Sequence, residues 1–420
     1  MTSEVLMLNK DAVVIAADSA VTTGQAPHPR YSKSANKIFD LTSHGNAALN
    51  IYASADIDRV PWELVLKIYR SMQSGVPQEK HLPDYRGVLI GFLQNNSMLF
   101  PPGVLQSILQ KRIISGVLYT LDLLEGCEPK LTDVHASAAD RQLAWTNAVA
   151  KVSGFLGGIS LFHSLTPADQ QLAKNERLNV VASLGTEVKA EPKYAFVDLH
   201  ILVDIAVEAL VKVPHHFLSS TGVVISGYGA DDIFPSFTHF RVFGHIGNSL
   251  AWEEEKVYSI THDNQAWIEP FAQSSMIERF TDGFDSSLLK INKNCANDLI
   301  TRIVDSIVAS GIVVPSSVVD AIRDAQIEQF MKEFRTKNWD QNFHPLRRVL
   351  NSLSVQEMGH LAESLLVVEE LRERVTSPSE SVGGPIDVAV VTKAEGMVWL
   401  KRKHYFDPAL NLRYLARAKN

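Results

Sequence analysis

The first twenty-four residues, MTSEVLMLNKDAVVIAADSAVTTG (1–24), decide the expected fold of this chain. Two short apolar runs, residues 5–8 and 13–17, flank a polar break. Short apolar runs on either side of a polar turn are typical of a β-hairpin. A threonine, Thr2, comes shortly before the first run, and an aspartate, Asp18, ends the second.

Thr2 has unusual chemistry if Met1 is removed, because it then carries both a hydroxyl and a free α-amine. An α-amine has a pKa of about 7.7–8.0, against about 10.4 for a lysine. Part of it is therefore unprotonated near neutral pH, and one residue supplies both nucleophile and base. Only Met1 precedes Thr2. Because threonine is small enough for methionine aminopeptidase, we expect Thr2 to be exposed by loss of Met1 alone.

Four motifs resemble proteasome β-type subunits, including the bacterial proteasome-like ones, which are N-terminal nucleophile (Ntn) hydrolases. The motifs occur in the family's order: ADSAVTTG (17–24), KIFDL (37–41), YASAD (52–56) and, near the C-terminus, GGPIDVAVVTKAEG (383–396). The ordered N-terminal match runs from residue 2 to about 75. The middle half of the chain matches the family poorly.

The resemblance implies roles for the residues that match. Thr2 would be the nucleophile, and Lys37 would place a cation beside it. Such a charge lowers the pKa of the hydroxyl and of the neighbouring amine. Asp18 would hold Lys37 through a charge-assisted hydrogen bond. Thr22 would lie on the strand that binds the substrate.

The resemblance also implies an oxyanion hole, in which a backbone N–H faces the developing negative charge. The family uses a glycine there, and here Tyr52 or Ala53 occupies that place. A backbone amide survives this change, but the tyrosine side chain would narrow the pocket.

Other polar residues around the threonine depart from the family. Ser274 or Ser275 would replace a family serine near the amine. Ser379 and Val382 stand where the family has an aspartate and a serine, with Glu380 adjacent. The candidate supporting residues are therefore Ser274, Ser275, Ser379 and Glu380.

The resemblance implies an α+β fold, the four-layer αββα sandwich of Ntn hydrolases. We expect residues 1–420 to form a single domain, with helical insertions at roughly 85–220 and 284–345, where the apolar period is near 3.6. Residues 353–402 would complete the sandwich with a helix and a hairpin. Within the first insertion, 88–93 and 180–184 suggest short strands.

Composition excludes several classes of protein. The net charge of −7 and the pI of about 6.1 argue against a nucleic-acid binder. No stretch reaches the ~18 apolar residues that a membrane span needs. Two cysteines cannot form a disulfide framework or a four-thiolate site, which favours a cytoplasmic protein. The histidines lack a metal-binding spacing such as His-Glu-x-x-His. We expect neither a metal nor an organic cofactor.

The sequence therefore predicts a proteasome-like threonine hydrolase that cleaves peptide or amide bonds with Thr2 and can self-associate. An ATPase partner is not specified by the sequence. One alternative is a non-catalytic scaffold subunit, favoured by Tyr52, Ser379 and Val382. Another is an Ntn amidase that acts on a small molecule, because a fold alone does not define a reaction.

Overall fold

The computed structural model describes residues 3–23, 30–73, 75–133, 135–185, 197–313, 315–376, 383–404, 406–407 and 410–411. Within these ranges the chain is an α+β structure with several antiparallel sheets. Two of the sheets have five strands each. Two further sheets have two strands each and pair β3 (Val21–Thr23) with β4 (Arg30–Ser32), and β7 (Asp56–Ile57) with β8 (Val60–Pro61).

The first large sheet contains the N-terminal hairpin predicted from the sequence. β1 pairs with β2 so that Glu4 lies opposite Ala17 and Leu8 opposite Val13. The C-terminal hairpin, also predicted, adds the last two strands. The order is β12 (Ala266–Ala272), β1 (Ser3–Asn9), β2 (Ala12–Ala17), β13 (Asp387–Thr392) and β14 (Gly396–Lys401).

The second large sheet is also antiparallel and includes part of the 37–41 motif on β5. Asn50 on β6 lies opposite Ile38 on one side and Val224 on the other. The order is β11 (Ser249–Ser259), β10 (Ser236–Ile246), β9 (Thr221–Gly227), β6 (Ala47–Ala53) and β5 (Ile38–Asp40).

One apolar cluster joins the two large sheets and explains how β1 is oriented. Leu6 and Leu8 of β1 belong to this cluster, together with Val224 and Phe237 of the second sheet. Val5 and Met7, the alternate residues, belong to a different cluster with side chains of α13 (Val355–Thr376). Successive side chains on a strand point to opposite faces, so even-numbered residues of β1 face the other sheet.

Helices make up most of the rest of the described chain. The 26-residue α3 and the buried α8 are the core of one helical region. The helices are α1 (Trp62–Met72), α2 (Asp84–Asn95), α3 (Pro102–Cys127), α4 (Ala138–Gly157), α5 (Pro167–Asn175), α6 (Arg177–Leu184), α8 (Leu199–Lys212), α9 (Ser275–Asp282), α10 (Ser286–Ala309), α11 (Ser316–Asn338), a π-helical turn (Trp339–Phe343), α12 (His344–Leu350) and α13, with 3₁₀ turns at Pro129–Leu131 and Pro214–His216. None of the described helices is long and apolar enough to cross a membrane.

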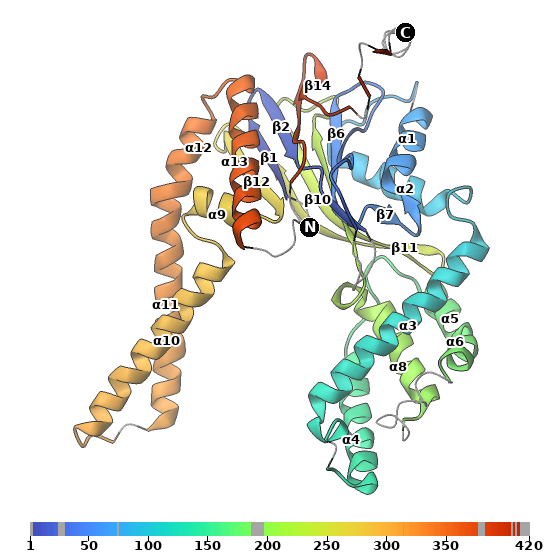
Figure 1. Ribbon diagram of the computed structural model, residues 1–420, viewed down its shortest axis with the longest axis vertical. Helices are drawn as coiled ribbons and strands as arrows, with labels where there is room; N and C mark the ends of the chain where they lie inside the picture. The colour runs from blue at the N-terminus through green and yellow to red at the C-terminus, as the bar shows by residue number, and fades with distance from the viewer. Residues whose placement is uncertain are drawn as a thin grey trace.

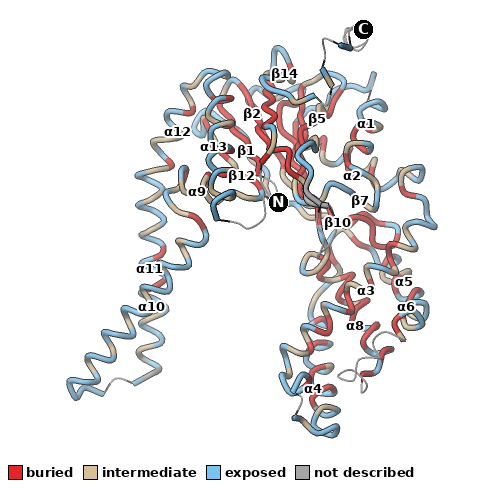
Figure 2. Tube along the Cα trace, in the orientation of Figure 1, coloured by how far each residue is buried: buried red, intermediate tan, exposed pale blue. Residues whose placement is uncertain are grey.

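Two helical arms diverge from the sheets, one built from α10 and α11 and the other from α3, α4 and α8 (Figure 1). The second arm has an apolar core, to which α3 contributes Ile113 and α8 contributes Leu202, and this core continues to Phe243 of the second sheet. The first arm is much more exposed, and no residue of α10 is buried (Figure 2). Most of the helical chain therefore does not cover a sheet.

The four-layer αββα sandwich expected from the sequence is wrong as a description of this chain. The described residues form four antiparallel sheets rather than two. The long helices α3, α4, α10 and α11 extend away from the sheets instead of lying on them as outer layers (Figure 1). The division into one domain with two insertions stays a prediction.

Two short strands expected in the first insertion are helical instead. Residues 88–93 lie inside α2, where Leu89, Ile90 and Leu93 are buried. Residues 180–184 form the end of α6. A short apolar run has the same pattern in a buried strand and in a buried helical turn, which explains both errors.

Candidate active site

The β1–β2 hairpin places Asp18 beside the start of the chain. The Ser3 backbone N–H donates to Asp18 Oδ1 at 3.1 Å, and the Asp18 N–H donates to the Ser3 carbonyl at 3.1 Å. Asp18 is only 2% exposed. This reciprocal pair ties Asp18 to the residue directly after Thr2.

Lys37 lies just before β5 and meets Asp18 in the buried interior. Its Nζ is 2.5 Å from Asp18 Oδ1, and the Lys37 side chain is 4% exposed. Burial lowers the pKa of Lys37, and the negative charge of Asp18 opposes this shift. The ion pair predicted from the sequence is therefore present and nearly dry.

The other Asp18 oxygen reaches the C-terminal glycine pair. Gly383 N–H donates to Asp18 Oδ2 at 2.9 Å. Gly383 has φ +139°, which side-chain-bearing residues rarely adopt, and a Cβ there would lie 2.9 Å from the Glu370 carboxylate. Asp18 thus holds together three parts of the chain, around Ser3, Lys37 and Gly383.

A second buried carboxyl group, Glu4, lies next to this pair and was missed by the sequence analysis. Glu4 is fully buried, and its Oε2 accepts a hydrogen bond from Asn50 Nδ2 at 2.6 Å. Burial raises the pKa of Glu4 to about 8, against the lowering effects of Lys37 and of the Asn50 hydrogen bond. Its position could have been found from the strand pattern, because it precedes Leu6 and Leu8 on the face that points into the core.

Tyr52 fills the space beside β9 near the end of β6. Its hydroxyl is 2.7 Å from His239 Nε2, and its ring centroid is 5.8 Å from that of Phe271. Its ring lies directly over Gly222, where a Cβ would come within 2.1 Å of ring atoms. Burial lowers the pKa of His239 to about 4, so the imidazole is neutral at pH 7.

Ala53, the other candidate for the oxyanion hole, has a left-handed backbone. Its φ is +67°, a region in which a non-glycine residue is strained. The backbone conformation at Ala53 is therefore one that glycine adopts more readily.

Ser274 and Ser275 lie at the start of α9, and both side chains contact carboxylates. Ser274 Oγ donates to Glu278 Oε1 at 2.6 Å, and Ser275 Oγ donates to Glu369 Oε1 at 3.1 Å. The preceding Gln273 carbonyl accepts from Ser3 Oγ at 2.8 Å. The start of α9 thus lies beside the start of β1. The side chains of Ser274 and Ser275, however, are hydrogen-bonded to carboxylates of α9 and α13.

Of the remaining predicted site residues, only Thr22 lies among the residues that the structure describes. Thr2, Ser379 and Glu380 lie outside the described residues, as does Val382. Thr22 is part of β3, opposite Tyr31 on β4.

A third polar cluster surrounds Asp58, which the sequence analysis did not single out. Its Oδ1 accepts from Arg112 Nη2 at 2.6 Å, and its Oδ2 is 2.7 Å from His245 Nδ1. Asp58 and Arg59 both have positive φ, +49° and +68°. Together with Arg112 they line a cavity of about 490 Å³ that also contacts Ser54, the residue after Ala53. Among the described residues no group of three His, Cys, Asp or Glu side chains could hold a metal ion.

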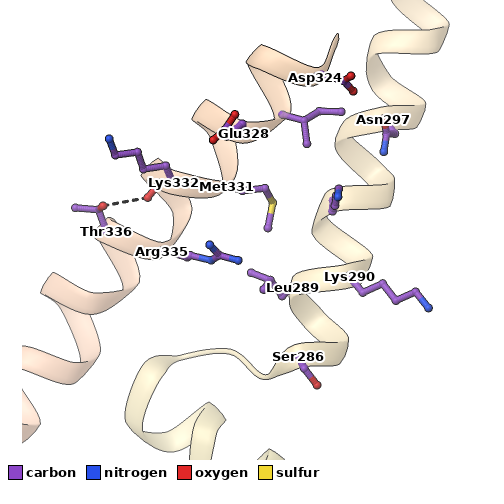
Figure 3. A pocket seen from close by; sticks show the side chains of 12 residues that line it. Ser286, Leu289, Lys290, Asn297, Asp324, Glu328, Met331, Lys332, Arg335 and Thr336 are labelled. Carbon is purple, nitrogen blue, oxygen red and sulfur yellow. Dashed lines mark hydrogen bonds between the residues drawn. The ribbon is translucent and has the colours of Figure 1, made fainter. Parts of the chain in front are cut away.

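A larger cavity of about 840 Å³ lies between α10 and α11, far along the chain from Asp18 and Lys37 (Figure 3). Its walls carry Met331, Lys332 and Arg335 of α11 and Leu289 and Lys290 of α10. These lining residues do not form a pair of nucleophile and base. We therefore place the candidate chemistry at the Asp18–Lys37 pair.

No protein-family model matches the chain, and no curated protein matches it. Solved structures that resemble it include two of Anbu. One is a helical assembly of the Anbu complex from Pseudomonas aeruginosa, at 10% identity over 99% of this chain and 94% of that chain, with a TM-score of 0.27. The other is an Anbu (Gly-1) mutant from Hyphomicrobium sp. strain MC1, at 7% identity over 100% and 95%, with a TM-score of 0.30.

These comparisons correct the family assignment made from the sequence. The identification as a proteasome β-type or bacterial proteasome-like subunit is wrong, because no family model or curated protein supports it and the similar structures are Anbu complexes. The motifs that suggested it are short, and the ordered N-terminal match covers only about a sixth of the chain. Identities this low transfer no catalytic residue, so the function has to be argued from the contacts of this chain.

Proposed function

We propose that this protein hydrolyses amide bonds with Thr2 as an N-terminal nucleophile, after Met1 has been removed. The observation that carries the proposal is the buried Lys37–Asp18 pair. Asp18 Oδ1 accepts both from Lys37 Nζ and from the N–H of Ser3, the residue after Thr2. A buried ammonium is therefore held one residue away from the proposed nucleophile.

The chemistry needs little more than this arrangement. The free α-amine of Thr2 takes the hydroxyl proton, and the oxygen attacks the substrate carbonyl to form a tetrahedral intermediate. The C–N bond of the substrate then breaks, the protonated α-amine gives its proton to the leaving amine, and an acyl-enzyme remains. The Lys37 ammonium favours the deprotonated forms of both groups by its charge. Water then releases the acyl group and restores the threonine.

A backbone N–H at Ala53 is the proposed donor to the oxyanion. The strained φ of Ala53 supports this role, because strain of this kind concentrates at functional sites. The cavity next to Ser54 offers room for a substrate side chain. A peptide or another amide is the substrate class that we propose.

The experiment is N-terminal sequencing followed by labelling with a β-lactone. Sequencing should read Thr-Ser-Glu-Val, and mass spectrometry should find one adduct on Thr2. Thr2→Ala should not be labelled, whereas Thr2→Ser should retain part of the reaction because hydroxyl and amine both remain. A retained Met1, or an equal adduct in Thr2→Ala, would refute the hydrolase and leave a non-catalytic scaffold as the better reading.

A further inference from the structure

Glu4 occupies a position that strands normally give to an apolar residue. It lies on the same face of β1 as Leu6 and Leu8, which pack between the two large sheets. Its side chain is completely buried, and Oε2 accepts from Asn50 Nδ2 at 2.6 Å. Its other oxygen, Oε1, is buried without a hydrogen-bond partner among the described residues. An ionised carboxylate would pay a large desolvation penalty in this place.

The charges around Glu4 come from the proposed catalytic cluster. Lys37 attracts its negative form and Asp18 repels it. The net result of burial and these charges is a Glu4 pKa of about 8. Near neutral pH Glu4 is therefore mainly a neutral carboxyl group, buried beside the Asp18–Lys37 ion pair.

We propose that Glu4 is a positioning residue that keeps a proton beside the Asp18–Lys37 pair and so maintains the positive potential that Lys37 exerts on Thr2. The effect on Thr2 rests on the proposed function, whereas the proton on Glu4 does not. When Glu4 loses this proton to solvent, a second carboxylate faces the single ammonium. The added negative charge raises the pKa of the Thr2 hydroxyl and amine, so the nucleophile becomes weaker.

Other titratable groups face this cluster and set the limits of the effect. Tyr52 extends from β6 towards Glu4, and its pKa is raised by burial, so it stays neutral across the relevant range. Lys403 acts on Lys37 from the C-terminal segment but is paired with Asp387. Burial also lowers the pKa of Lys37, which is why the variants have to be compared over a full pH range.

The first measurement is the rate of β-lactone labelling between pH 6 and pH 10, compared between the unmodified protein and Glu4→Gln. The glutamine oxygen can still accept from Asn50, and the carboxamide cannot ionise. In the unmodified protein the rate should fall by up to tenfold per pH unit above about pH 8. In Glu4→Gln, each profile being scaled to its own maximum, this fall should move upward by at least one pH unit.

Two further variants make the labelling measurement more specific to Glu4. Asn50→Ala removes a hydrogen bond that lowers the Glu4 pKa, so it should also move the fall upward, and it serves if Glu4→Gln does not fold. Glu176→Gln is the matched control. Glu176 is a buried carboxylate between α5 and α6, and it accepts hydrogen bonds from Gln106 and Gln110 of α3. Its profile should coincide with that of the unmodified protein.

The second measurement is the urea midpoint of unfolding as a function of pH, which needs no activity. The folded pKa of Glu4 lies above its unfolded value of 4.5, so its protonated form stabilises the fold. That stability is complete below pH 4.5 and is lost as the pH rises towards 8. The midpoint of the unmodified protein should therefore fall over this range relative to Glu4→Gln. Parallel midpoint curves would overturn the proposal.

The two measurements, labelling and unfolding, distinguish the hypothesis about Glu4 from the hydrolase hypothesis. Diverging midpoint curves together with a displaced labelling profile support the role of Glu4 in full. Diverging midpoints with no Thr2 labelling in any variant would refute the hydrolase and, with it, the effect of Glu4 on Thr2. Labelling profiles that coincide, or a fall that moves to lower pH in Glu4→Gln, would overturn this inference while leaving the hydrolase intact.

Discussion

Lys37 Nζ lies 2.5 Å from Asp18 Oδ1, and both side chains are almost completely buried. Removing one partner from such a pair leaves an uncompensated charge in the interior, which commonly costs about 3–5 kcal/mol. The same Asp18 also accepts the backbone N–H groups of Ser3 and Gly383. Besides its part in the proposed chemistry, the pair therefore connects the N-terminal hairpin to the segment before β13.

Asp18→Asn should lower the free energy of unfolding by about 3 kcal/mol, because the buried ammonium of Lys37 loses its counter-ion. Urea unfolding at pH 7 measures this. The control is Asp320→Asn, which breaks an exposed pair with Arg323 and should change stability by less than about 0.5 kcal/mol. A loss in Asp18→Asn no larger than in the control would show that the pair contributes no stability.

His239 should make the protein less stable at acid pH. Burial holds its folded pKa at about 4, below the ordinary 6.5, so the unfolded chain binds this proton more tightly. The contribution is complete above pH 6.5 and is lost as the pH falls towards 4, by at most about 3 kcal/mol. His239→Gln, which can still bond to the Tyr52 hydroxyl, should remove this part of the pH dependence.

The matched control for His239 is His262→Gln, at an exposed histidine. Unfolding free energies at pH 7 and pH 4.5 should differ less in His239→Gln than in the unmodified protein and in the control. Equal differences in all three proteins would exclude His239 as a source of acid sensitivity.

The sequence was most informative where local pattern and pairing agree. The apolar runs 5–8 and 13–17 on either side of a polar break predicted β1 and β2, and the hairpin expected within 353–402 is present as β13 and β14. The contact between Lys37 and Asp18 was also expected, from the family resemblance. These features need only local sequence or a short ordered motif.

Other features depend on contacts between distant segments, which one sequence does not reveal. Glu4 is explained by Asn50, forty-six residues away in the chain, and Tyr52 by His239 on another strand. Residues 88–93 form part of a helix because α2 buries them against the second sheet, although their composition also suits a strand. The apolar periodicity did not predict that the two arms extend away from the sheets. A helix that lies on a sheet and a helix in an arm have the same apolar period.

Gly222→Ala should strongly destabilise the site around Tyr52. The new Cβ would come within 2.1 Å of the tyrosine ring, so either the ring or β9 has to move. Overpacking of this kind costs about 1–3 kcal/mol. Gly91→Ala in α2 is the control, since its Cβ would meet no atom within 4 Å outside the nearby backbone of its own helix, and alanine favours a helix. Thermal unfolding that ranks Gly222→Ala at or above Gly91→Ala would contradict the close approach of Tyr52.

The most direct measurement of the central claim is the extent of β-lactone labelling on the N-terminal peptide of Lys37→Ala, compared with the unmodified protein and with Lys67→Ala, which removes an exposed lysine. Circular dichroism first establishes that each variant is folded. The account predicts an adduct on Thr2 in the unmodified protein and in Lys67→Ala, and at least a hundredfold slower labelling in folded Lys37→Ala. Labelling of Lys37→Ala at the rate of the unmodified protein would contradict the proposed mechanism.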